Sequence, residues 1–156
     1  MSVPDSYRDF LEALRKASGI DSFVSDESGL VSVRVDDAYN LNLLIIEATG
    51  KVLCFVEVAE LPPDAPRAVY RRLLSAGLFG KDTAGGYFTL EPETDTVIYN
   101  YFFDLKTAAD DVDDFIRTIE KILQLCDFWA ERIKDGMSSE QHEPADKIPA
   151  KHMIRA

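Results

Sequence analysis

Apolar residues recur along the chain with two periods, one typical of helices and one typical of strands. A helix is predicted for residues 4–17, with apolar side chains at i, i+3, i+4 and i+7: Tyr7, Phe10, Leu11 and Leu14. A second is predicted to start after Asp64, its N-cap, and to end near residue 76, with Gly77 in the left-handed conformation. A third covers residues 110–134 and is closed by Gly136.

Five segments instead have the composition of β-strands, rich in branched and aromatic residues and bounded by turn residues. They are residues 30–35, 40–48, 51–58, 87–91 and 96–104. A two-residue turn, Thr49-Gly50, joins the second to the third. The order α-β-β-β-α-β-β-α predicts an α+β domain, in which helices pack on a twisted antiparallel sheet.

The predicted strands are apolar on both faces, although an antiparallel sheet with one wet face should alternate apolar and polar residues. Within each of three strands the apolar side chains fall into two opposed sets. They are Leu41, Leu43 and Ile45 against Leu44 and Ile46 on the second strand, Leu53 and Phe55 against Val52, Cys54, Val56 and Val58 on the third, and Val97, Tyr99, Tyr101 and Phe103 against Ile98 and Phe102 on the last. Three helices can cover one face, so the other has to meet a second subunit, a client protein or both. In the alternative, the long last helix crosses to the second face and completes a monomer.

Charge and length narrow the class of protein. The 156 residues fit one domain, predicted as residues 1–136 with a flexible polar tail at 137–156. Seventeen Lys and Arg against 28 Asp and Glu leave a net charge of −11, which disfavours nucleic acid and anionic membranes as partners. The start has no basic region followed by an apolar run, and no segment has the roughly 20 apolar residues of a membrane span.

No pattern of residues indicates catalysis, a metal or a cofactor. Both histidines, His142 and His152, fall in the predicted tail. The acidic run at 110–114 lacks the spacing of a calcium loop and suits the first turn of a helix, and the glycine-rich loop at 80–86 precedes a strand rather than a helix. Cys54 and Cys126 lie in apolar runs and are interpreted as buried free thiols, which indicates a reducing compartment, the cytoplasm.

One passage carries a resemblance to a known family. Residues 73–80 (LLSAGLFG), the turn at 83–86 (TAGG), an aromatic strand and Asp95 before Val97 are similar to the helix-end, glycine-turn and strand pattern of the Tir chaperone (CesT) family, the class I chaperones of type III secretion. Members often carry Asn where Gly77 stands, and either residue tolerates a left-handed backbone. The resemblance covers roughly residues 4–134.

The resemblance implies a cytoplasmic homodimer that uses no ATP or other cofactor and binds the unfolded N-terminal segment of a secreted effector. It places the dimer interface on the second helix and the strands after it, at Tyr70, Leu73, Leu74, Tyr99 and Tyr101. It places client binding on the first helix and the sheet, at Phe10, Leu14, Val31, Val33, Leu43, Ile45 and Phe55.

Two other functions stay open at this point. A CesT-like adaptor or regulatory domain without a secretion role would have the same fold and the same apolar surface. A small-ligand enzyme or sensor would need a cavity between helix and sheet, which Tyr99, Tyr101 and Asp104 could line.

Overall fold

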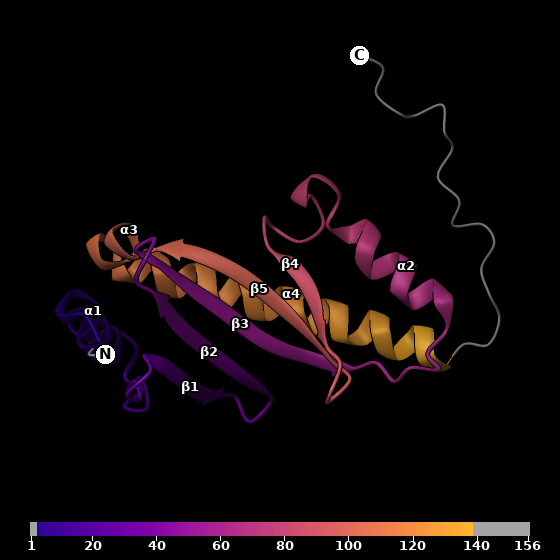
Figure 1. The fold of residues 1–156 in the computed structure, drawn as a ribbon, viewed down its shortest axis with the longest axis horizontal. Helices are drawn as coiled ribbons and strands as arrows, with labels where there is room; N and C mark the ends of the chain where they lie inside the picture. Colours follow the sequence, from indigo (N-terminus) through magenta and orange to yellow (C-terminus); the bar gives the residue numbers. More distant parts are fainter. Residues whose placement is uncertain (1–2, 139–156) are drawn as a thin grey trace, which may run out of the picture.

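The computed structural model describes residues 3–138, and its helices and strands follow the predicted order (Figure 1). The strands are β1 Leu30–Val35, β2 Tyr39–Ile46, β3 Lys51–Glu60, β4 Tyr87–Glu91 and β5 Thr96–Asp104. The helices are α1 Asp5–Ser18, α2 Arg67–Ala76, the 3₁₀ turn η1 Leu78–Gly80, α3 Leu105–Asp110 and α4 Val112–Ser138. The predicted α+β class is confirmed. Of the predicted tail at 137–156, residues 137 and 138 belong to α4 instead, and residues 139–156 lie outside the described residues.

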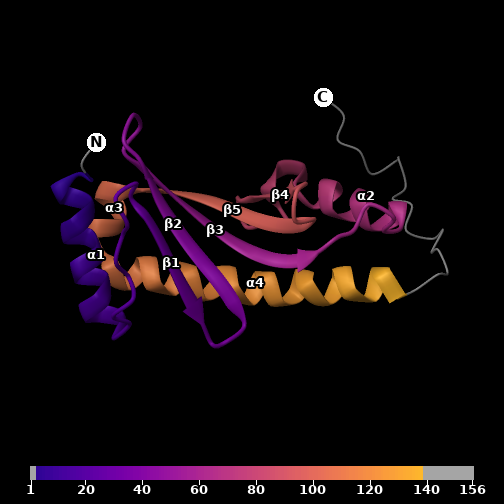
Figure 2. The same ribbon diagram turned by 60° about the horizontal axis from the view of Figure 1, so that its bottom comes forward.

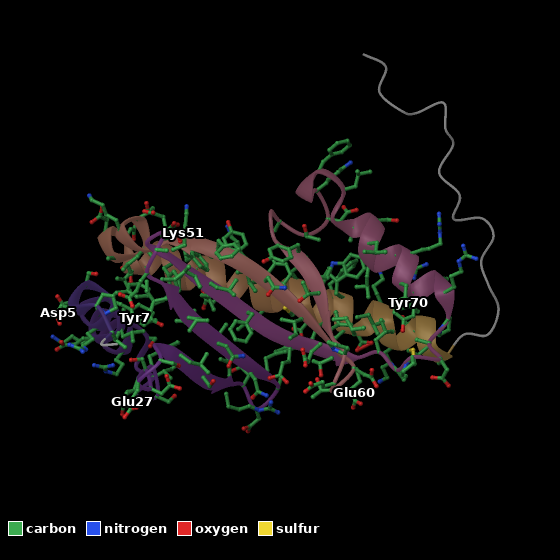
Figure 3. All side chains as sticks on the ribbon, in the orientation of Figure 1. Asp5, Tyr7, Glu27, Lys51, Glu60 and Tyr70 are labelled. Carbon is green, nitrogen blue, oxygen red and sulfur yellow. The ribbon has the colours of Figure 1, made fainter. Side chains whose placement is uncertain are left out.

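All five strands form one antiparallel sheet in the order β1-β2-β3-β5-β4. The long central strand β3 pairs with β2 on one side and β5 on the other, so that β1 and β4 are the two edges. A bulge between Glu57 and Ala59 shifts the register of β3 against β5. Lys51 and Glu60 mark the two ends of β3 (Figure 3).

The helices α1, α3 and α4 pack on a single face of the sheet, with α4 running across it (Figures 1 and 2). The side chains of the sheet that turn to this covered face are buried: Val31, Val33, Leu41, Leu43, Ile45, Val52, Cys54, Val56, Val97 and Tyr99. They meet apolar side chains of the helices, for example where the rings of Phe10 and Phe115 pack edge to face with centroids 5.0 Å apart. The alternative in which the long last helix crosses to the second face is therefore excluded for the described residues, and that face stays uncovered by α4.

Four details of the helices differ from the prediction. Pro66, not Asp64, precedes α2, and Gly77 keeps a right-handed conformation (φ −77°) because the chain continues into η1. A separate helix, α3, precedes α4, since the Asp104 side chain accepts a hydrogen bond from the backbone N–H of Thr107 and starts a helix at once after β5. Gly136 lies inside α4, which extends to Ser138.

The loop between α2 and β4 is fixed on its inner side. The Tyr99 hydroxyl donates to the carbonyl of Thr83 (2.7 Å), and the Thr83 hydroxyl donates to the carbonyl of Gly86 (2.7 Å). Trp129 of α4 donates from Nε1 to the carbonyl of Asp82 (3.3 Å). Since β5 and α4 both hold this loop, its outer part, including Phe79, is presented on a rigid support.

Both cysteines are free and buried, as predicted. Burial raises the pKa of Cys126 to about 12, and the nearby Asp127 carboxylate adds to the effect. Burial also raises the pKa of Cys54 well above its ordinary value. Neither thiol therefore has the ionised form that nucleophilic chemistry requires.

Gly86→Ala is expected to destabilise the fold by about 1–3 kcal/mol, because a Cβ there would lie 2.4 Å from the Tyr99 hydroxyl and 2.5 Å from the Asn100 carbonyl oxygen. Gly77→Ala is the matched control: the nearest atom lies 3.7 Å from its Cβ, and the helical backbone favours alanine by about 0.4–1 kcal/mol. Urea unfolding of the two variants measures both effects. Equal stabilities would show that the loop yields and is not fixed by Tyr99.

The thiols are expected to resist an aromatic disulfide reagent in the folded protein. At pH 8 a thiol of pKa about 12 is ionised in only about one molecule in ten thousand, and burial blocks access as well. Both cysteines should react fully in concentrated urea, and the reaction is followed by absorbance. A rapid reaction of one equivalent in buffer would contradict this assignment.

Candidate protein-binding surfaces

The second face of the sheet carries no helix of the described chain. This open face consists of Leu30, Ser32 and Arg34 of β1, Asn40, Asn42 and Leu44 of β2, Leu53, Phe55 and Glu57 of β3, Ile98, Asn100 and Phe102 of β5, and Tyr87 and Thr89 of β4. The strand register arranges these side chains in rows that cross the sheet, and the rows differ in polarity.

One row is wholly apolar across four strands. Leu30 pairs with Leu44, Leu44 with Leu53, and Leu53 with Phe102. Phe102 is 48% exposed, and its ring stacks on that of Tyr87 with centroids 6.5 Å apart. An apolar row of this kind on a sheet face is a surface that another protein segment can cover.

The next row alternates amides and aromatic rings, and its amides are already bonded within the sheet. Asn42 accepts from the Ser32 hydroxyl (2.7 Å) and donates to the carbonyl of Phe55 (3.3 Å). Asn100 donates to the Thr89 hydroxyl (2.9 Å) and to the carbonyl of Tyr87 (3.3 Å). The hydrogen-bonding groups of these amides therefore have partners within the sheet and do not need a ligand.

The far end of the open face is charged. Asn40 accepts from the Arg34 guanidinium (3.1 Å) and donates to the Glu57 carboxylate (3.1 Å), which forms a polar ladder across β1, β2 and β3. A shallow hollow of about 470 Å³ opens beside it, lined among others by Glu60 and Thr94. The open face thus changes from apolar to charged along the direction of the strands.

A second apolar surface follows the side of the molecule where α2, η1 and β4 lie (Figures 1 and 2). Exposed Leu74, Leu78 and Phe79 lie on α2 and η1, and exposed Leu90 lies on β4; we name these four residues the α2–β4 surface. Phe79 is 85% exposed and has a left-handed backbone (φ 60°), which costs energy for any residue with a Cβ. Such a combination of strain and exposure in an aromatic residue is typical of a contact site.

The residues predicted for client binding mostly belong to the core. The first six are buried on the covered face: Phe10, Leu14, Val31, Val33, Leu43 and Ile45. A client could reach them only if α1 or α4 moved. Phe55 is the exception, since it is half-buried on the open face between Asn42 and Asn100. Client contact with any of them stays a prediction.

The residues predicted for the dimer interface are divided in the same way. Leu74 is 80% exposed, whereas Leu73 and Tyr99 are buried and Tyr101 is half-buried against Phe103. Tyr70 is half-buried on α2, and its hydroxyl donates to the carbonyl of Pro62 (3.0 Å; Figure 3).

Sequence reasoning did not select Leu78, Phe79 or Leu90. The sequence does contain a signal for Leu78 and Phe79. These two apolar residues lie in a predicted turn, where polar residues are usual.

The described residues offer little for chemistry. Among residues 3–138 no three His, Cys, Asp or Glu side chains are grouped as metal ligands would be, and no helix is long and apolar enough to cross a membrane. Burial raises the pKa of Tyr99 above its ordinary value, so it is a neutral hydrogen-bond donor. Hydrogen bonds from Thr107 lower the pKa of Asp104, and the Asp104 carboxylate is used to cap helix α3. The surfaces described above are suited to holding another protein.

Comparison with solved structures gives the same fold in known complexes. One chain of the ExsC–ExsE complex is 19% identical with a TM-score of 0.70, covering 84% of this chain and 96% of that chain. One chain of the HopA1–SchA chaperone–effector complex is 19% identical with a TM-score of 0.67, covering 81% and 94%. One chain of the ExoU–SpcU complex from the type III secretion system of Pseudomonas aeruginosa is 15% identical with a TM-score of 0.58, covering 81% and 96%.

Sequence comparison assigns the family. A protein of Chlamydia pneumoniae is 28% identical over 83 residues, which are 53% of this chain and only 61% of that protein. A profile of the Tir chaperone protein (CesT) family matches residues 9–130, which is most of the chain. The chain therefore belongs to the Tir chaperone protein (CesT) family.

Proposed function

We propose that this protein is a non-enzymatic, cytoplasmic chaperone of type III secretion that binds, as a homodimer, the unfolded N-terminal segment of a secreted effector. The observation that carries the proposal is the open face, whose apolar row no helix of the described chain covers. Family membership supports it, as does the presence of the same fold in a chaperone–effector complex.

The hydrogen bonding of the open face decides how a client lies on it. Backbone groups in the middle of the sheet are used in the ladders, and the amides of Asn42 and Asn100 are bonded within the sheet. An extended segment across the face would bury its own N–H and C=O groups without partners. A helix satisfies these groups itself, so the client is helical where it crosses the open face and extended only along the free edge of β1, because the edge of β4 belongs to the dimer described below.

The apolar row has the size that such a helix needs. Four strands at about 4.8 Å spacing give a row about 14 Å long, which matches about ten helical residues. Each large apolar side chain that becomes fully buried there contributes roughly 1.5–3 kcal/mol before the cost of ordering the client. Two or three such side chains suffice to hold a segment that is disordered when free.

The α2–β4 surface supports the homodimer. Its exposed leucines and Phe79 are adjacent to β4, the edge strand, whose outer backbone groups have no strand partner among the described residues. A second copy would cover both the apolar side chains and the edge. Contact with a partner also explains why a strained conformation at Phe79 is retained.

Client binding is tested with Phe102→Asp, a change at the exposed end of the apolar row. The tagged protein is purified from its source bacterium, the bound protein is identified by mass spectrometry, and its N-terminal segment is co-expressed for limited proteolysis. We expect protection of this segment by the wild-type protein and its loss with Phe102→Asp, because a charge would be buried under the client.

The matched control is Thr89→Asp, which adds the same charge at the polar end of the open face. It should keep the protection, since the new carboxylate can still accept the hydrogen bond from Asn100. If no bound protein shows a protected segment, or if both variants behave like the wild type, the client role of the open face is refuted.

The dimer is tested with Phe79→Gly, which removes the exposed ring and relieves the left-handed backbone. The wild-type protein should sediment as a dimer of about 35 kDa, twice 17.5 kDa. Loss of a buried phenylalanine worth about 1.5–3 kcal/mol should weaken the dimer by at least tenfold, while the variant stays folded by circular dichroism.

Val24→Ala serves as the control, because Val24 is 58% exposed in the loop before β1 and should not affect association. A wild-type protein that is monomeric at micromolar concentration would exclude the dimer. If the Phe79→Gly variant associates as strongly as the wild-type protein, the α2–β4 surface is not part of the dimer interface.

A further inference from the structure

Between residues 117 and 132 the outward side of α4 separates its charges into two stripes, and the exposed Asp114 and Asp135 lie in line with the first stripe beyond its two ends. At 100° per residue, one sector of about 60° holds four exposed side chains between residues 117 and 132, of which three are cationic and one aromatic: Arg117, Lys121, Phe128 and Arg132. The adjoining sector holds the exposed carboxylates Glu120, Asp127 and Glu131. We name the first group the basic stripe.

Phe128 is held in place at the surface. It is 49% exposed, and the guanidinium carbon of Arg132 lies 4.7 Å from the centre of its ring. On its other side the ring packs edge to face on Trp129 at 5.8 Å. Trp129 is itself fixed by the ring of Phe88 (5.3 Å) and by its hydrogen bond to Asp82. An aromatic side chain held in this way loses little entropy when a partner binds it.

The fold does not require the basic stripe. Its members point away from the sheet, and Arg117 and Lys121 stand at i and i+4, where like charges are slightly unfavourable. Arg117 forms one ion pair, with Asp114 at 3.4 Å, which lies beyond the end of the stripe. The chain has 28 acidic and 17 basic side chains, so its surface is negative on average. The row of cations around the exposed ring has the opposite charge.

We propose that the basic stripe docks an acidic segment of a partner protein, with carboxylates paired to the cations and one apolar side chain packed on Phe128. The stripe extends over about 22 Å of helix, the length of about 15 helical residues in a partner. Its side chains are exposed on α4, and α4 packs on the covered face of the sheet (Figure 2), so the partner and a client on the open face can bind at the same time.

The charge of the chain favours a protein over a nucleic acid in this role. A polyanion would experience the net charge of −11 along its whole length, whereas a short acidic segment meets chiefly the local cations. The exposed ring of Phe128 adds an apolar contact that a phosphate backbone does not use.

The probe is a synthetic 16-residue helical peptide with glutamates and one leucine on one face, titrated into the isotopically labelled full chain. We expect saturable shifts of the backbone amide signals of residues 117–132 and weaker binding as salt rises from 50 to 300 mM. Lys121→Glu should weaken the affinity at least fivefold, and Phe128→Ala at least threefold. The same peptide with lysine in place of glutamate should not bind.

Lys134→Glu is the matched control, since it makes the same charge change at an exposed position of α4 outside the stripe. It should alter the affinity less than twofold. The proposal is overturned if Lys134→Glu has the effect of Lys121→Glu, if the shifts map to the open face, or if a single-stranded oligonucleotide binds the stripe more tightly than the peptide. Dissociation of the homodimer by Phe128→Ala would also overturn it, because the stripe would then belong to the dimer interface.

Discussion

The structure depends on an imbalance between one sheet and its helices. The strands present apolar side chains on both faces, yet α1, α3 and α4 all pack on the same face. The chain can therefore fold around a complete core, with residues such as Val52 and Tyr99 fully buried, and still leave Leu53, Phe55 and Phe102 in contact with water. One face of the strands thus forms the core, and the other is left for the proposed client. Successive residues along a strand belong alternately to the two faces.

The loop at the α2–β4 surface also has a buried side and an exposed side. The inner side of the loop after α2 is held by Tyr99, Thr83 and Trp129, while Phe79 has a left-handed conformation and an exposed ring on the outer side. Buried hydrogen bonds and an exposed aromatic ring therefore lie on opposite sides of one loop.

Sequence patterns predicted the strands well and the roles of their residues less well. The ends of β4 and β5 follow from the aromatic and branched runs between turn residues, and both opposed sets of side chains follow from the period of two. The period does not say which set the helices will cover, since both are apolar. The family resemblance placed Val33 and Leu43 at the client surface, and the period could not show that the helices cover these residues, which lie in the core.

The sequence also did not predict the conformation of Phe79. A local pattern favours glycine for a left-handed backbone, and Gly80 has one, but Phe79 beside it has one as well, whereas Gly77, which was expected to have one, does not.

Charge explains where copies of this chain and their partners can meet. A net charge of −11 makes two copies repel one another wherever their carboxylates come close, within a screening length of about 8 Å at physiological salt. The helix α2 carries three arginines and no carboxylate, so contact through this helix places the least negative element of one copy against the other. The basic stripe of α4 is the other surface where an acidic segment meets cations instead of carboxylates. Acidic side chains keep the rest of the surface solvated. Apolar contact with another protein is therefore limited to the open face, the α2–β4 surface and the ring of Phe128, the places proposed to bind proteins.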